Sequence, residues 1–172
     1  MSPFHRTSEL PAPRERATGS LWGRSARLAT PACRERADVL PKDRDFVAMH
    51  AAYRGSGGMA RGDDLARLLE DRQRGDFVSL ARLIVAGEIF SFEWHHSFWV
   101  PMFQFELRDL STKAAAHQVL AELARAFDGW ALALWFTQPN SCLDGQRPVD
   151  LLDSNLPAVL GAARTARFIA VG

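Results

Sequence analysis

The hydrophobic pattern of the chain is helical before residue 90, has a period of two over residues 90–94, and is helical again after residue 110. In the segment EIFSFEW, Phe90, Phe92 and Trp94 alternate with polar residues, which predicts a strand with one buried face. HHS is typical of a turn, and FWVPMFQFE predicts a returning strand. Because Pro101 cannot donate a ladder hydrogen bond, that strand is expected to lie at an edge or to bend there. The pattern predicts one β-hairpin in a helical chain.

Helical patterns precede this hairpin. Residues 43–54 predict a helix, which the GSGG at 55–58 ends. GDDLARLLEDR and FVSLARLIVAGE then predict two short helices joined by a turn that contains glycine, with Asp76 as the N-cap of the second. Helix, short turn and helix are the outline of a helix-turn-helix, and the hairpin after it is placed like a wing.

The last third of the chain predicts four further helices. The first is expected to follow a cap at Ser111–Thr112, and the second to follow a cap at Asp128. The third has Pro148 in its first turn, and the fourth starts at Asn155. The expected fold class is therefore mainly α, a small helical domain with a helix-turn-helix-like pair, one β-hairpin and a C-terminal helical subdomain. We expect three parts, residues 1–42, 43–108 and 109–172.

The first part differs from the rest in charge and in proline content. Residues 1–42 hold five prolines and show no sustained apolar period, so we expect a disordered lead with a turn or two of helix around Arg24–Leu28. Residues 1–44 carry nine Lys and Arg against five Asp and Glu, a balance of +4, and the remaining residues carry twelve against fifteen, a balance of −3. A solvated tail or a wrongly assigned start codon is favoured over an arm that binds nucleic acid.

Length and composition place the chain among ordinary globular proteins. With 172 residues, 47% of them hydrophobic, it is long enough for one domain with a core. No apolar run approaches the ~20 residues of a membrane span, and the first residues lack the apolar centre of a secretory signal. Cys33 and Cys142 are too few for a disulfide framework. We expect a cytoplasmic protein without a membrane partner.

The histidines do not have the spacing of a metal site. His95 and His96 are adjacent in the predicted turn, with Glu93 two residues earlier, whereas a site needs three or four convergent ligands. A solvated turn is favoured over metal binding. His50 and His117 each stand alone on a predicted helix and are interpreted as surface or core-edge residues.

The nucleophiles and carboxylates also lack a catalytic pattern. Ser141 and Cys142 have no neighbouring base and no nucleophile elbow, so a buried structural cysteine is favoured at 142. Asp150 and Asp153 are one helical turn apart and are interpreted as a solvated face. Neither a P-loop nor a GxGxxG motif occurs. We therefore expect no enzyme activity and no cofactor.

Basic residues near the helix-turn-helix-like pair make a thin footprint for DNA. A recognition helix usually presents several polar and basic side chains. The candidates here belong to the two short helices and the turn between them: Arg67, Arg72, Arg74, Ser79 and Arg82. The chain after residue 44 carries a net charge of −3, so the helix-turn-helix shape is favoured over its use in DNA binding.

Aromatic side chains are dense along residues 90–105. We expect about half of them to fill the core under the hairpin, and the rest to form an interface patch if they are exposed. The set is Phe90, Phe92, Trp94, Phe98, Trp99, Phe103 and Phe105.

The segment FTQPNSCLDGQRPVDLL, with Trp130 ahead of it and AVLGAARTA after it, resembles the C-terminal toxin-binding domain of Xre/MbcA/ParS antitoxins. The shared features are a tryptophan-led helix, an Asn–x–x–Leu–x–Gly–x–x–Pro turn and two short helices, and they cover residues 115–172. Upstream, Pro101, Phe103, Gln104 and Phe105 match a run that precedes this domain in some relatives. The resemblance implies a non-enzymatic, dimeric antitoxin whose C-terminal helices occlude the active site of an NAD-consuming RES-domain toxin. In many members the N-terminal part represses the operon.

The residues expected to contact a partner follow from this resemblance and from the turn. Gly145 suits a positive φ, Pro148 presets the first turn of a helix, and Leu143 is expected to point inward. Arg147, Arg164 and Arg167 are expected on the rim, and the terminal FIAVG is expected to plug the toxin. The full set of expected partner-binding residues is Trp130, Trp135, Asn140, Leu143, Gly145, Arg147, Pro148, Arg164 and Arg167. The alternative is a small DNA-binding regulator that acts through residues 62–105.

Overall fold

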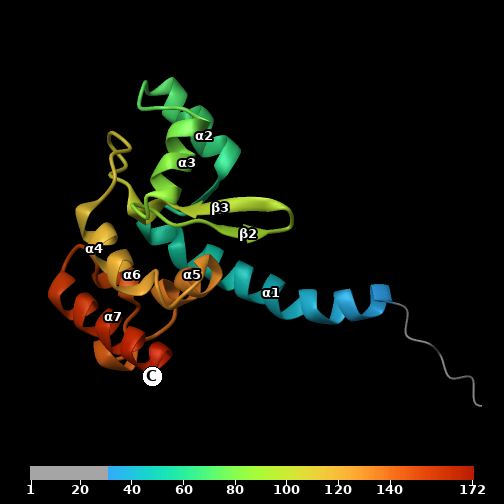
Figure 1. Cartoon of the computed structure of the whole chain (residues 1–172), viewed down its shortest axis with the longest axis vertical. Helices are drawn as coiled ribbons and strands as arrows, with labels where there is room; N and C mark the ends of the chain where they lie inside the picture. Colours follow the sequence, from blue (N-terminus) through green and yellow to red (C-terminus); the bar gives the residue numbers. More distant parts are fainter. Residues whose placement is uncertain (1–30) are drawn as a thin grey trace, which may run out of the picture.

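The computed structural model describes residues 31–172, with side chains from residue 42 onward (Figure 1). In chain order the elements are α1 (Pro31–Tyr53), η1 (Arg54–Ser56), β1 (Met59–Arg61), α2 (Gly62–Asp71), α3 (Phe77–Val85), β2 (Phe92–Trp94), β3 (Ser97–Pro101), η2 (Met102–Gln104), α4 (Ala114–Leu123), α5 (Gly129–Thr137), η3 (Ser141–Leu143), α6 (Pro148–Leu151) and α7 (Leu156–Val171). Figure 1 places α2 and α3 at one end and α4–α7 at the other. The expected mainly helical fold class is confirmed, and the structure adds to it one small antiparallel sheet.

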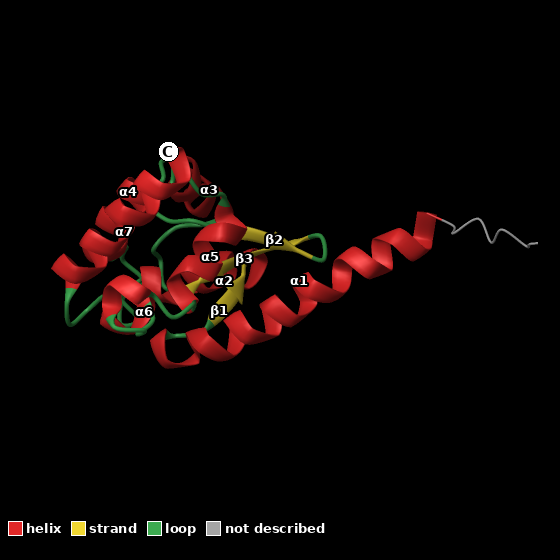
Figure 2. Ribbon diagram, turned by 90° about the horizontal axis from the view of Figure 1, so that it is seen from below, coloured by secondary structure: helices red, strands yellow, loops and turns green. Residues whose placement is uncertain are grey.

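Helix α1 starts earlier than the sequence pattern predicts. It begins at Pro31, whereas we expected the ordered body to begin at residue 43. The pattern did not indicate a helix over residues 31–42, because their apolar residues show no sustained period and two of the five prolines, Pro31 and Pro41, lie there. The expected turn of helix around Arg24–Leu28 lies outside the described residues. The first turns of α1 extend away from the body (Figure 2), and its last turns pack against α5.

The sheet has three strands in the order β1-β3-β2, one more than the predicted hairpin. Strand β1 pairs with β3 from Met59↔Pro101 to Arg61↔Trp99. With three residues, β1 is too short to show an alternating pattern, which explains why it was missed. Strand β3 is central, so the expectation of an edge strand at Pro101 is wrong. The alternative expectation, a bend at the proline, is confirmed, because β3 ends at Pro101 and continues into η2.

Three of the four predicted helix caps are present. The carboxylates of Asp76 and Asp128 accept from the backbone N–H groups of Ser79 and Ala131, and the Asn155 side chain accepts from Ala158. The cap expected at Ser111–Thr112 is absent. Helix α4 begins after Lys113 without a side-chain cap.

An isolated β-bridge explains the late start of α4. Thr112 pairs with Phe105 in an antiparallel bridge, and the Lys113 N–H donates to the Gln104 carbonyl at 2.8 Å. These bonds keep residues 112–113 extended, so helical geometry starts only at Ala114.

Two clusters of buried apolar side chains stabilise the fold. The smaller one joins α2 and α3 to β3 and η2, and contains Leu65, Leu69, Leu80, Val100 and Phe105. The larger one joins the end of α1, β2 and η2 to the four C-terminal helices. Its members include Phe46, Met49, Tyr53, Phe92, Phe103, Leu120, Leu132, Phe136, Leu152 and Val159. The larger cluster therefore combines residues from the two expected parts 43–108 and 109–172.

Candidate protein-interaction surface

The turn at residues 138–147 has the shape expected from its sequence. The Asn140 side chain accepts from the Cys142 N–H at 2.9 Å, and the Asn140 carbonyl accepts from the Gly145 N–H at 2.9 Å. Gly145 has φ 77°, and Leu143 is 4% exposed, as predicted. Asp144 also has a left-handed backbone, with φ 53°. Asn140 therefore closes the turn, and its role is to hold the backbone in place.

The end of the turn leads directly into α6. Pro148 occupies the first helical turn, as expected, and is buried. Arg147 remains partly exposed and its Nε lies 2.5 Å from the Asp150 carboxylate. The turn thus presents Arg147 to solvent, while Leu143 and Pro148 fix the angle between α5 and α6.

Cys142 corrects one of our expectations. Cys142 is exposed, whereas the sequence favoured a buried structural cysteine at this position. In the short helix η3 only Leu143 turns inward, so Ser141 and Cys142 both face solvent. A leucine next to a cysteine does not reveal which of the two points to the core.

Helix α7 packs on α4 and η3 and ends in an exposed apolar tip. Val159, Ala162 and Ala163 are buried on its inner side. Phe168, Ile169 and Val171, which we call the α7 tip, are 78%, 74% and 72% exposed. Hydrophobic side chains are commonly found on protein surfaces singly, whereas here three exposed ones fall within four consecutive residues.

A shallow groove lies between the α7 tip and the turn. Its volume is about 220 Å³, and its lining combines residues 139–142 of the turn with Ala162, Thr165, Ala166 and Ile169 of α7. Ile169 belongs to both the groove and the tip, so the two features form one continuous surface. Of the expected partner-binding residues, Asn140 contributes to this lining.

Two of the expected rim arginines are held by one carboxylate of α4. The Nε of Arg164 lies 2.9 Å from the Glu122 carboxylate, and a guanidinium nitrogen of Arg167 lies 2.5 Å from it. The hydrogen bond from Arg164, followed by the positive charges of Arg167 and Arg164, lowers the pKa of Glu122. Both arginine side chains remain substantially exposed, at 61% and 44%.

The two tryptophans expected to contact a partner pack against the chain itself. Trp130 is half-buried, its ring meets that of Phe92 edge to face at 5.5 Å, and the Lys42 ammonium lies 6.0 Å from its centroid. Trp135 meets Phe136 edge to face at 5.0 Å. The structure thus places these side chains against the larger core.

The histidines of the hairpin turn have a structural environment. His95 and His96 both have positive φ, as residues of a tight turn do. The Nε2 of His95 lies 3.1 Å from an Asp43 oxygen that also accepts from the Trp94 indole N–H. Within the described residues, no three His, Cys, Asp or Glu side chains are grouped as metal ligands.

Most of the candidate DNA-contacting residues form ion pairs or hydrogen bonds within the chain. Arg67 pairs with Asp64, Arg74 pairs with Asp109, and Arg72 donates to the Arg108 carbonyl. The Ser79 hydroxyl donates to the Asp76 carboxylate, whose pKa is lowered by its bonds from Ser79. Arg82 is exposed, and on α3 its exposed neighbours are the apolar Phe77, Val78 and Val85.

Comparison with family models, with curated proteins and with solved structures finds no match to this chain. In the part of the chain that the structure describes, no helix combines the length and the apolar character of a membrane span.

Proposed function

We propose that the chain is an antitoxin-like binding protein, which neutralises a cognate toxin of the RES type by packing its C-terminal helices over the toxin active site. The observation that carries the protein-binding part of the proposal is the exposed α7 tip and the groove that continues from it. The resemblance of residues 115–172 to the toxin-binding domain of Xre/MbcA/ParS antitoxins supplies the class of partner.

The energetics of the α7 tip support a role in binding. Covering an apolar side chain contributes about 1.5–3 kcal/mol, so three such side chains are a large fraction of the free energy of a typical complex. The tip is flanked by Arg164 and Arg167, and α7 carries no acidic residue. An apolar centre beside a basic rim fits a partner surface with an apolar pocket and acidic edges.

A growth assay tests this function. The gene beside that of this chain is expressed alone and together with it, and with the variant Phe168→Asp/Ile169→Asp. We expect the neighbouring gene to arrest growth, the wild-type chain to restore it, and the variant to fail. The matched control Val47→Asp/Val85→Asp changes two apolar residues that are equally exposed elsewhere, 67% and 88%, and should still restore growth. A harmless neighbouring gene, or rescue by the tip variant, would contradict the proposal.

A DNA-binding regulator is the second candidate, and the element order favours it. The element order is helix, strand, helix, helix, strand, strand, with β3 in the centre of the sheet. This order is consistent with a winged helix-turn-helix in which α3 would be the recognition helix and the β2–β3 hairpin the wing. Against it stands the apolar face of α3, where Phe77, Val78 and Val85 are 47%, 54% and 88% exposed. This composition does not suit contact with phosphates, which polar and basic side chains make.

A gel shift with the chain's own promoter distinguishes this second candidate. Binding through phosphates must weaken steeply between low and physiological salt, because counterions are released on binding. Retardation at low salt that Arg82→Ala removes would support DNA binding through α3. If no retardation occurs at low salt, this candidate fails, and the antitoxin proposal is unaffected.

A further inference from the structure

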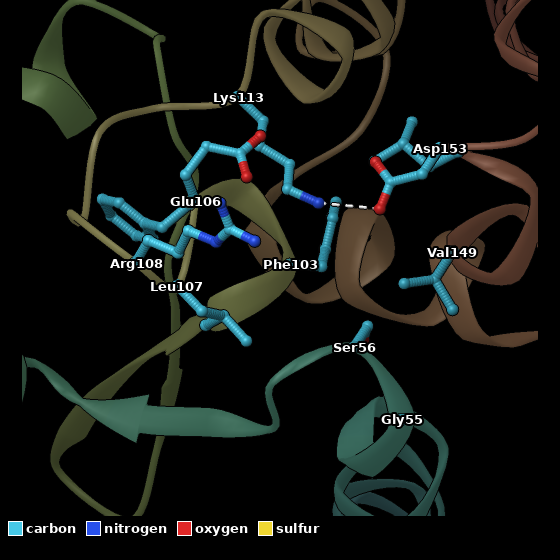
Figure 3. Close-up of a pocket in the computed structure, with 11 residues that line it drawn as sticks. Gly55, Ser56, Phe103, Glu106, Leu107, Arg108, Lys113, Val149 and Asp153 are labelled. Atoms are coloured by element: carbon cyan, nitrogen blue, oxygen red, sulfur yellow. Dashed lines mark hydrogen bonds and ion pairs between the residues drawn. The ribbon is translucent and has the colours of Figure 1, made fainter.

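A second hollow lies beside α6, and its lining shares no residue with the α7 tip or its groove. Its volume is about 290 Å³, and its lining comes from η1, from the segment after β3, from Lys113 before α4, and from α6 and the residues after it. Figure 3 shows these side chains around a common space. The lining residues are Gly55, Ser56, Phe103, Phe105, Glu106, Leu107, Arg108, Lys113, Val149, Leu152 and Asp153.

The loop of residues 106–111 forms one wall of this hollow, which we call the cleft, and is held by its own hydrogen bonds. The Glu106 N–H donates to the Ser111 carbonyl at 2.8 Å, and the Glu106 carbonyl accepts from the Leu110 N–H at 2.7 Å. Asp109 accepts from the Ser111 hydroxyl and N–H, and these bonds lower the pKa of its carboxyl group. The wall is therefore preformed, which reduces the entropy lost when a ligand binds.

Four charged side chains surround the cleft and their charges cancel. The Lys113 ammonium lies 2.7 Å from the Asp153 carboxylate, and the Lys113 side chain is only 17% exposed. Glu106 and Arg108 belong to the loop after β3, and neither forms an ion pair within the described residues. In Figure 3 the Glu106 carboxylate and the Arg108 guanidinium are both near the open space. The cleft thus offers one free positive and one free negative group.

Apart from Ser56, the remaining side chains of the lining are apolar. Phe103, Val149 and Leu152 belong to the larger core and form one side of the cleft, where Figure 3 shows Phe103 and Val149 bordering the space. Leu107 is 57% exposed and lies on the loop side. A ligand that reaches between these side chains gains apolar burial in addition to its polar contacts.

Charge and size together restrict the class of ligand. A simple anion would be attracted by Arg108 but repelled by Glu106. A simple cation would be attracted by Glu106 but repelled by Arg108. A zwitterion satisfies both, with its carboxylate on Arg108 and its ammonium on Glu106. The volume of about 290 Å³ is at the lower end for small-ligand pockets, which fits a molecule of the size of a single amino acid.

We propose that this cleft binds a free α-amino acid with an aliphatic side chain. The carboxylate binds Arg108, the ammonium group binds Glu106, and the side chain lies against Phe103, Val149 and Leu152. Since the lining comes from both η1 and α6, a bound amino acid stabilises the contact between these two elements. This proposal is independent of the α7 tip, so either can fail alone.

Calorimetric titration of the full chain with three probes tests the proposal. The probes are L-leucine, leucinamide, which lacks the carboxylate, and 4-methylpentanoate, which lacks the ammonium group. We expect binding of leucine, and binding about tenfold weaker for each of the other two, because each has lost one charge-assisted contact. No heat with leucine, or equal affinity for all three probes, would overturn the proposal.

Two variants connect the binding to the cleft. Arg108→Gln and Glu106→Gln remove the free charges, and each should weaken leucine binding about tenfold. Arg125→Gln changes an exposed arginine outside the cleft and should leave it unchanged. Both cleft residues are exposed, and the melting temperature without ligand checks that each variant is folded. If one cleft variant does not fold, the other decides, and wild-type affinity in a folded cleft variant contradicts the assignment.

Discussion

Gln104 is a buried polar residue whose side chain joins the two ends of the hairpin. Its Oε1 accepts from the Phe90 N–H at 2.7 Å, and its Nε2 donates to the carbonyls of Phe90 and Pro101, both at 3.0 Å. The residue is 0% exposed, so no solvent replaces these bonds. The amide thus fixes the entry to β2 against the exit from β3.

Replacing Gln104 should therefore destabilise the fold strongly. In Gln104→Ala three backbone groups lose their partner in a buried place, and we expect the free energy of unfolding to fall by about 3 kcal/mol. Urea denaturation measures this value. The control Gln118→Ala, at an exposed position of α4, should change it by less than about 0.5 kcal/mol. A similar small effect at Gln104 would show that the bonds contribute little.

Glu122 makes stability depend on pH. Its pKa is lowered in the folded protein, first by the hydrogen bond from Arg164. The stabilisation that it contributes is present above the unfolded pKa, about 4.3, and is lost as the pH falls through the lower folded value. Glu122→Gln should therefore destabilise the chain at pH 7, and the difference from the wild type should disappear in strong acid.

Urea denaturation at a series of pH values follows this difference. Glu70→Gln, at an exposed residue of α2 that makes no such bonds, serves as the control. A difference between wild type and Glu122→Gln that is constant from pH 7 to strong acid would contradict the role of the ion pairs.

Among the elements, two helical glycines have opposite environments. A Cβ at Gly129, the first residue of α5, would lie 2.0 Å from the Ser91 carbonyl oxygen, whereas a Cβ at Gly161, inside α7, would meet nothing within 4 Å. Gly129 allows α5 to approach the strand region closely. Gly161 has no such role, and it only lowers the helix propensity of α7.

The same substitution should therefore have opposite effects in α5 and α7. Gly129→Ala should destabilise the fold by about 2 kcal/mol or more, because backbone must move, and Gly161→Ala should stabilise it by about 0.5–1 kcal/mol. Melting temperatures of the two variants compare these effects. A stabilising alanine at residue 129 would mean that the close approach of α5 to Ser91 is not required.

Helices and their caps were the part of the fold that could be predicted from the sequence. Asp76, Asp128 and Asn155 cap their helices as expected, because a capping side chain acts on residues only two or three positions away. Long-range pairing was not predictable in the same way. Strand β1 and the bridge between Phe105 and Thr112 depend on partners that are distant in the sequence, and the bridge delays α4.

The candidate site was predictable in shape but less so in exposure. The positive φ of Gly145 and the inward Leu143 follow from local chemistry. Helical periodicity does not tell whether a tryptophan faces its own chain or a partner, and Trp130 and Trp135 pack on the chain itself. The exposed α7 tip was indicated by the apolar terminal FIAVG, which we expected to enter a partner.

For the whole molecule, the larger core predicts that residues 42–172 unfold together. It combines α1, β2 and η2 with α4–α7, and the Tyr53 hydroxyl in α1 donates to the Ala133 carbonyl in α5 at 2.9 Å. Burial raises the pKa of the Tyr53 hydroxyl group. We expect tryptophan fluorescence and far-ultraviolet circular dichroism to give one urea midpoint. Two separate midpoints would show that the expected parts 43–108 and 109–172 fold independently.

The central claim is that the α7 tip docks on another polypeptide, and an affinity measurement with the purified product of the neighbouring gene tests it most directly. We expect the wild-type chain and the Val47→Asp/Val85→Asp control to bind with the same Kd. The Phe168→Asp/Ile169→Asp variant should bind about a hundredfold more weakly, because two residues at the centre of the contact are lost. Equal affinity of the tip variant and the wild type, or no binding by the wild type, would contradict the claim.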